Sequence, residues 1–93
     1  MEFERDDATS EACFHERGFD FEYAAQAFFD PQRQVAPDTR RAYGEDRFLL
    51  VGRIAHRVFV VVYTPRAGAC RIISARKANL REVQVYDRHA QED

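Results

Sequence analysis

The stretch from Val58 to Thr64 constrains the fold more than any other, because all seven of its residues are β-branched or aromatic. Residues of both kinds favour strands, where they pack well on a pleated surface. The nearly continuous apolar character is typical of a strand covered on both faces, although a short apolar run can also belong to a buried helix. We therefore expect a central strand around which the rest of the chain is built.

Two further strands are expected beside the central one. Arg47–Ile54 precedes it, with Ala55–Arg57 as a tight connection, and Cys70–Ala75 follows it after a turn over Pro65–Ala69. Connections this short join neighbouring antiparallel strands, so the pattern predicts a β-meander. The polar stretch 32–45 reads as a connection that holds at most one short strand.

A first helix is expected near the N-terminus. Asp6 or Asp7 can cap a helix that runs to about Glu16, and Gly18 is suited to ending it. Phe3 belongs to a short first strand or to an extended arm.

A second helix is expected between Asp20, which can cap it, and Asp30–Pro31, because a residue before proline avoids helical geometry. Its apolar residues recur at helical spacing on one face: Phe21, Ala24, Ala25 and Phe28. A last helix is expected over about Lys77–Arg88, with three candidates for core-facing side chains: Leu80, Val83 and Tyr86. Two helices, an antiparallel meander and a C-terminal helix make an α+β fold.

Residues 1–93 have the length of one domain, and a hydrophobic fraction of 45% suffices for one core. No apolar run approaches the roughly 20 residues that a membrane span requires. The acidic start, Met1–Asp7, lacks the basic and apolar regions of a signal peptide. We therefore expect a single cytoplasmic domain with no membrane segment.

The two cysteines, Cys13 and Cys70, are far apart in the sequence and form no C-x-x-C pair. A structural zinc site has no support from this spacing, and we expect neither a metal nor a cofactor. One disulfide is an alternative, but two buried free thiols fit a reducing compartment better.

Acidic and basic residues are separated along the chain. Residues 1–30 carry nine acidic and two basic side chains, residues 31–81 carry three and eleven, and residues 82–93 carry four and one. All but one of the 14 basic residues are arginine, whose planar guanidinium suits two-point contact with phosphate. The basic middle segment therefore favours binding of a polyanion, although solvated charges on strand edges and loops would give the same count.

Four segments together resemble the BrnT family of toxins from bacterial toxin–antitoxin pairs. Phe3–Asp6 is close to the family's F-E-W-D opening, and Gly18–Pro31 is similar to its G-x-x-F-x-x-A-x-x-x-F-x-D-P. Asp38–Arg47 resembles D-x-R-x-x-Y-G-E-x-R. Arg71–Tyr86 matches R-I-I-S-A-R-x-A-x-x-x-E-x-x-x-Y, the most specific of the four. The resemblance covers nearly the whole chain.

The resemblance implies a RelE-like fold and a metal-independent ribonuclease that arrests translation and growth. It also implies neutralisation by a BrnA-like ribbon-helix-helix antitoxin in a complex of two toxins and two antitoxins. In such a complex operator DNA is bound only through the antitoxin, and RNA is the substrate of the toxin.

The chain departs from the family pattern near its N-terminus. Arg5 stands where the family usually has Trp, Thr9 and Cys13 replace a common Lys and Asn, and Glu16-Arg17 replaces Lys-His. The change from Lys to Glu reverses a charge. One alternative is therefore a catalytically weakened relative that binds RNA or the antitoxin. Another is a sheet-based interaction protein whose arginine-rich surface contacts an acidic protein.

Cleavage of RNA without a metal needs a base for the 2′-hydroxyl, cations around the developing phosphorane and an acid for the leaving oxygen. We predict that Arg47, Arg71 and Arg76 supply the cations. Arg71 and Arg76 are five residues apart and would face opposite sides of a regular strand, but Arg76 lies where the strand gives way to the helix. A salt bridge to Glu82 is the alternative for Arg76.

Glu45 is the candidate general base, because it is one of the three acids in the basic segment. A structural ion pair with Arg47 or Arg41 is its alternative. Tyr86 is the candidate proton donor or base-stacking residue, and a packed aromatic side chain is its alternative. The histidines are weaker candidates for catalysis: His15, His56 and His89.

Overall fold

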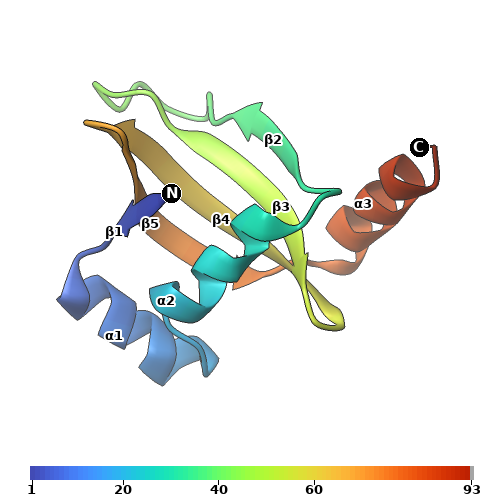
Figure 1. Cartoon of the computed structure of the whole chain (residues 1–93), viewed down its shortest axis with the longest axis horizontal. Helices are drawn as coiled ribbons and strands as arrows, with labels where there is room; N and C mark the ends of the chain where they lie inside the picture. Colours follow the sequence, from blue (N-terminus) through green and yellow to red (C-terminus); the bar gives the residue numbers. More distant parts are fainter. Residues whose placement is uncertain (93) are drawn as a thin grey trace.

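A five-stranded sheet forms the centre of the molecule in the computed structural model, which describes residues 1–92 (Figure 1). Its strands are β1 (Glu2–Glu4), β2 (Gln34–Pro37), β3 (Phe48–Ile54), β4 (Arg57–Arg66) and β5 (Ala69–Lys77). They lie in the order β1-β5-β4-β3-β2. The chain is therefore an α+β protein whose central strand is β4, the strand that contains the apolar run.

The sheet is mixed, which corrects the expectation of a purely antiparallel meander. The strands β2 to β5 pair antiparallel in sequence order, as predicted for β3, β4 and β5. However, β1 pairs parallel with the outer edge of β5, where Phe3 lies opposite Cys70. A strand of three residues shows too little alternation to reveal either its pairing or its direction.

Four helical segments flank the sheet: α1 (Asp7–Arg17), α2 (Phe21–Ala24), the 3-10 helix η1 (Ala25–Phe29) and α3 (Leu80–Glu92). The second predicted helix is thus one α-helical turn that tightens into a 3-10 helix. The segments α1 and α2 lie together at one side of the molecule, whereas α3 lies apart from them (Figure 1). None of these helices has the length and apolar composition that a membrane crossing demands.

The predicted helix signals at the N-terminus are confirmed. The Asp6 carboxylate caps α1, and Gly18 ends it in the left-handed conformation at φ 85°. The Asp20 carboxylate caps α2 by accepting a hydrogen bond from the Tyr23 amide at 2.9 Å. Between the two helices, the buried Ser10 hydroxyl accepts a hydrogen bond from the Phe21 amide at 3.0 Å.

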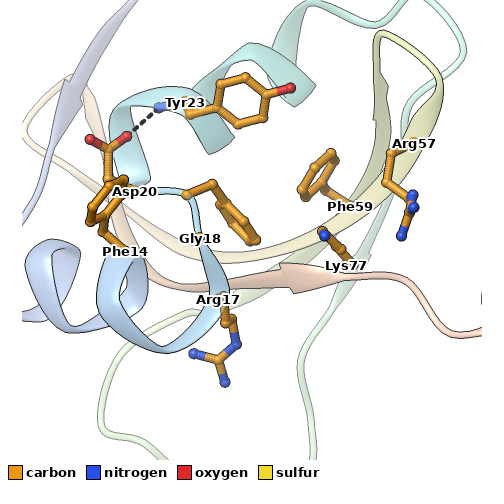
Figure 2. A pocket seen from close by; sticks show the side chains of 9 residues that line it. Phe14, Arg17, Gly18, Asp20, Tyr23, Arg57, Phe59 and Lys77 are labelled. Carbon is orange, nitrogen blue, oxygen red and sulfur yellow. Dashed lines mark hydrogen bonds between the residues drawn. The ribbon is translucent and has the colours of Figure 1, made fainter.

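The main core lies between the N-terminal helical segments and one face of the sheet. The helical side supplies Phe21, Ala24, Ala27 and Phe28, and the sheet supplies Leu50, Phe59, Val61 and Ile72. At one end of this core, Tyr23 and Phe59 pack edge to face with 5.9 Å between ring centres (Figure 2). Residues on the other face of β4 are also buried, including Val58, Val60 and Val62, so the expectation of a strand covered on both faces is confirmed.

Side chains from three strands hold α3. Gln34 of β2 donates to the Tyr86 carbonyl at 3.3 Å, Arg53 of β3 pairs with Asp87 at 3.0 Å, and Arg76 of β5 pairs with Glu82. The helix begins at Leu80 rather than near Lys77, because β5 continues to Lys77 in register with Phe59. Of the three residues predicted to face the core, Tyr86 is buried and Val83 is half-buried, but Leu80 is 74% exposed and that expectation is wrong.

Both cysteines are free thiols, as expected. Cys13 is buried and Cys70 is partly buried, and burial raises the pKa of each thiol.

Candidate functional site

Five charged side chains line one hollow of about 230 Å³, and four of them come from the loop before β3 and from β4 and β5. These four are Glu45 and Arg47 from the loop before β3, Arg66 at the end of β4, and Arg71 in β5. We call this hollow, defined by Glu45, Arg47, Arg66 and Arg71, the arginine pocket. Three of the five residues predicted as catalytic therefore come together.

The register of the sheet explains this convergence. Phe48 pairs with Tyr63, so Arg47, one residue earlier, comes beside Thr64. Thr64 pairs in turn with Arg71. Cross-strand neighbours share a face of the sheet, so both arginines flank Thr64, and Arg66 lies two residues further along β4 on the same face. The Thr64 hydroxyl donates a hydrogen bond to the Asp46 carbonyl at 2.6 Å, which ties the loop before β3 to β4.

Arg47 is held from two sides. Its Nε atom donates to Oε2 of Glu45 at 3.0 Å, and its guanidinium lies 4.0 Å from the centre of the Tyr43 ring. The Tyr43 hydroxyl in turn donates to the Asp38 carboxylate at 3.3 Å, and the Asp38 amide donates to the Arg47 carbonyl at 2.8 Å. These contacts fix the guanidinium before any substrate arrives.

Asp38 anchors this loop. Its side chain is almost fully buried and accepts hydrogen bonds from Nε and Nη2 of Arg40, both at 2.8 Å. The Arg40 guanidinium, helped by the Arg40 amide and the Tyr43 hydroxyl, lowers the pKa of Asp38 to about 2 against the burial of the carboxylate. Asp38 is therefore a charged anchor at neutral pH.

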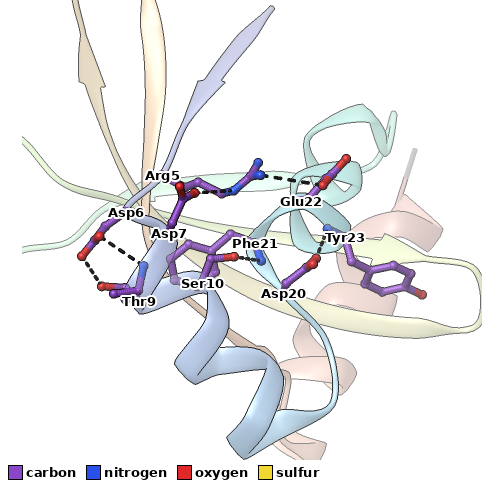
Figure 3. Close-up of polar contacts among 10 residues, drawn as sticks. Arg5, Asp6, Asp7, Thr9, Ser10, Asp20, Phe21, Glu22 and Tyr23 are labelled. Carbon is purple, nitrogen blue, oxygen red and sulfur yellow. Dashed lines mark hydrogen bonds and ion pairs between the residues drawn. The ribbon is translucent and has the colours of Figure 1, made fainter.

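The start of α1 forms one wall of the arginine pocket through Asp6 and Thr9. The Asp6 carboxylate accepts hydrogen bonds from the Ala8 amide and from the Thr9 hydroxyl, the latter at 2.7 Å (Figure 3). Arg5 is turned to other partners, Asp7 at 3.5 Å and Glu22 at 3.8 Å (Figure 3). The pocket thus holds three guanidinium groups against two carboxylates, which leaves it net positive.

Arg76 lies outside this pocket although it faces the same side of the sheet as Arg71. Tyr63 pairs with Ile72 and Val62 with Ser74, so Ile73 is an extra residue, a β-bulge that resets the alternation. The bulge places Arg76 opposite Val60, four residues along β4 from Thr64, or about 13 Å.

There Arg76 forms two hydrogen bonds with the Glu82 carboxylate, at 2.7 and 2.8 Å. This contact raises the pKa of Arg76 and lowers that of Glu82. It is the salt bridge that the sequence offered as the alternative, and the catalytic role of Arg76 stays a prediction.

Tyr86 also lies away from the arginine pocket. Its ring is 3% exposed and its hydroxyl donates a hydrogen bond to the Asp30 carboxylate. Burial and this hydrogen bond raise the pKa of Tyr86. Its catalytic role likewise stays a prediction. The histidines are not among the residues that line the pocket, and His56 is exposed in the turn between β3 and β4.

Four polar or charged residues of the pocket were not predicted from the sequence: Asp6, Thr9, Thr64 and Arg66. Arg66 was not predicted to line the pocket because Pro65 favours a turn at this point. In the structure β4 continues through Arg66, which pairs with Ala69. The available signal was alternation, since Arg66 lies two residues beyond Thr64 and so on the same face of an extended strand.

Among the side chains of residues 1–91, no cluster of three or more His, Cys, Asp or Glu could hold a metal ion. The donors of the arginine pocket are instead mainly guanidinium groups, which suit an anion such as phosphate.

Comparison with protein families gives a match over most of the chain. The family described as "Ribonuclease toxin, BrnT, of type II toxin-antitoxin system" matches residues 6–82, a span that includes every residue defining the arginine pocket. No curated protein matches the chain.

Proposed function

The chain belongs to the BrnT family of ribonuclease toxins of type II toxin–antitoxin systems, and from this premise we propose that it cleaves RNA at the arginine pocket without a metal ion. The convergence of Arg47, Arg66 and Arg71 with Glu45 on one hollow carries the proposal. Three cations from separate strands and loops can surround a phosphodiester, whereas a single surface arginine cannot.

In the proposed reaction the 2′-hydroxyl oxygen attacks the adjacent phosphorus and the 5′-oxygen leaves, which gives a 2′,3′-cyclic phosphate. Arg66 and Arg71 bind the non-bridging oxygens, whose negative charge grows in the phosphorane. Fixed donors aimed at developing charge are commonly the largest single contribution to catalysis. Arginine suits this role because its donors form a planar fork and its charge persists beside the reacting group.

Glu45 accepts the proton of the 2′-hydroxyl, and the leaving 5′-oxygen takes a proton from water. Arg47 orients the Glu45 carboxylate through their 3.0 Å hydrogen bond and adds positive charge near the phosphate. The stack on Tyr43 and the buried Asp38 carboxylate support this geometry by fixing Arg47 from behind. Positioning of this kind lowers the entropic cost of reaching the transition state.

The proposed target is messenger RNA in the cytoplasm, whose cleavage stops translation and growth. The proposed partner is a BrnA-like ribbon-helix-helix antitoxin in a complex of two toxins and two antitoxins, which binds operator DNA through the antitoxin alone. The net positive charge of the pocket supports an acidic or amphipathic antitoxin segment, since complementary charge speeds association.

The test is cleavage of a single-stranded RNA by the purified chain in excess EDTA, with the product ends identified as 2′,3′-cyclic phosphates. Arg71→Gln and Arg47→Gln should each lower the cleavage rate by about 10²–10³-fold, as the loss of one donor to a developing oxyanion does in other enzymes. Arg81→Gln is the matched control, because Arg81 is exposed and lies outside the pocket. It removes the same charge and should cleave as the parent chain does.

Three results separate this proposal from its alternatives. A requirement for a metal ion, or full activity of both Arg47→Gln and Arg71→Gln, contradicts the proposed site. Salt-sensitive RNA binding without cleavage identifies a catalytically weakened binding module. The variants Arg76→Gln and Tyr86→Phe in the same assay test the catalytic roles predicted for those two residues.

A further inference from the structure

A second hollow, of about 420 Å³, lies far from the arginine pocket. It opens on the face of the sheet that the N-terminal helices cover, beside Phe59 near the start of β4. Phe59 and Arg66 are seven residues apart on β4, a separation of about 23 Å along the strand. The two hollows are therefore separate sites on opposite faces.

Aromatic rings form much of the wall of this hollow. Phe19 and Phe59 pack edge to face with 5.0 Å between ring centres. The ring centres of Tyr23 and Phe59 are 5.9 Å apart (Figure 2). Phe19 and Phe59 are buried, but Tyr23 is 39% exposed and Phe14, which comes from α1, is 52% exposed. We call this hollow, defined by Phe14, Phe19, Tyr23 and Phe59, the aromatic pocket. Its two exposed rings offer surface against which a planar group can stack.

Three cations from three different elements border the same rings. Arg17 ends α1, Arg57 begins β4 and Lys77 ends β5. Lys77 is paired with Phe59 across the sheet, and Arg57 lies two residues before Phe59 on β4. The side chains of Arg57, Phe59 and Lys77 therefore share one face of the sheet. Figure 2 shows Arg57 and Lys77 beside the Phe59 ring.

These cations have few partners in the part of the chain that the structure describes. Among the side chains of residues 1–91, Arg57 and Lys77 form no ion pair, and Arg17 pairs only with the exposed Glu16 at 3.4 Å. The pocket has one carboxylate, Asp20, which is already engaged in capping α2. Its electrostatic character is therefore positive, and two of its cations are available for an external anion.

We propose that the aromatic pocket binds one unpaired nucleotide of a single-stranded RNA. The base stacks on Tyr23 or Phe14, and the phosphate binds Arg57 and Lys77. Aromatic rings next to cations are the usual means of binding single-stranded nucleic acid, because every base has a stacking face and every nucleotide a charge. A duplex does not fit this chemistry, since its bases are stacked on one another. The inference rests on the proposed function only in taking RNA as the ligand.

The binding test uses a short single-stranded RNA with 2′-O-methyl groups throughout, which cannot be cut by attack of its own 2′-hydroxyl. Its affinity is measured by fluorescence anisotropy at several salt concentrations. For Arg57→Gln/Lys77→Gln, the slope of the logarithm of the binding constant against the logarithm of the salt concentration should weaken by about 0.7, because one phosphate is no longer neutralised. Tyr23→Leu, which keeps an apolar side chain beside Phe59, should weaken binding roughly tenfold without changing that dependence.

The matched control is Arg81→Gln/Arg88→Gln, which removes the same charge from exposed positions on α3. It should bind like the parent chain, and thermal melting of every variant verifies folding. Parent-like binding by Arg57→Gln/Lys77→Gln overturns the inference, including the case in which those cations serve a protein partner instead. Equal losses in both double variants also overturn it, because they show a general charge effect.

The two proposals can fail separately. If the parent chain cleaves RNA and Arg57→Gln/Lys77→Gln binds RNA as the parent does, the proposed role of the aromatic pocket is wrong and the ribonuclease proposal still holds. Binding that depends on Arg57 and Lys77, without any cleavage by the parent chain, removes the ribonuclease proposal and supports the aromatic pocket.

Discussion

Gly52 lies where β3 packs against Ala27 of η1, and replacing it with alanine tests the packing that joins the two. A Cβ atom at this position would lie 2.6 Å from the carbonyl oxygen of Ala27, 3.2 Å from the Cβ of Ala27 and 3.2 Å from a methyl carbon of Leu50. The first contact is too short for a carbon and an oxygen, and the oxygen belongs to the backbone. No side-chain rotation can relieve it, so β3 and η1 must move apart.

The expected cost follows from two opposing effects. Overpacking a close-packed core costs about 1–3 kcal/mol, and a backbone partner places this case near the upper end. Alanine also lowers the conformational entropy of the unfolded chain, which stabilises the folded state by about 0.4–1 kcal/mol. We therefore expect Gly52→Ala to lower the free energy of unfolding by about 2 kcal/mol, which corresponds to a fall in Tm of roughly 8–16 °C for a domain of this size.

Urea titration and thermal melting followed by far-ultraviolet circular dichroism measure this change. Gly68→Ala is the control, because a Cβ there meets open space and only the positive φ of 82° is unfavourable. That control should lose about 1 kcal/mol, from backbone conformation alone. A Gly52→Ala chain as stable as the parent would refute the close approach of β3 to η1.

Three further predictions concern other contacts. The pKa of Asp38, about 2, lies below the ordinary value near 3.9, so its contribution to stability is complete above about pH 4 and is lost as the pH falls toward 2. Urea midpoints between pH 2 and 5 should therefore rise less steeply with pH for Asp38→Asn than for the parent, and identical slopes would contradict the anchor. Tyr86→Phe removes the hydrogen bond to Asp30 and should lower the free energy of unfolding by about 1–2 kcal/mol in urea titrations; an unchanged midpoint would argue against this contact. Because burial raises the pKa of both thiols, Cys13 and Cys70 should react slowly with iodoacetamide at pH 7.5 in the folded chain and quickly in urea, and equally fast labelling in both conditions would contradict their burial.

The parts of the fold that the sequence predicts are those encoded by neighbouring residues. The apolar run from Val58 places the central strand, and the caps at Asp6, Asp20 and Gly18 place the ends of α1 and the start of α2. Each of these signals acts within one turn of a helix or along one strand. These elements can therefore be predicted from the sequence without knowledge of the tertiary contacts.

The parts that escaped prediction depend on residues far apart in the chain. The parallel pairing of Phe3 with Cys70 and the continuation of β5 to Lys77 are decided by partners on other strands. For the candidate site, charge and motif identified Glu45, Arg47 and Arg71, but their common pocket follows from register. Arg66 joins them because β4 continues past Pro65 and stays paired with β5 as far as Ala69.

The extra residue at Ile73 divides β5 into two segments with opposite phase. Before it, odd-numbered residues such as Arg71 point away from the aromatic core, and after it even-numbered residues such as Arg76 do so. Deleting Ile73 would restore one continuous phase. The pairs Tyr63–Ile72 and Val62–Ser74 would then be consecutive, and Arg71 and Arg76 would stay opposite Thr64 and Val60. On a regular strand two residues five apart face opposite sides, so the bulge at Ile73 is what allows Arg71 and Arg76 to share one side of the molecule.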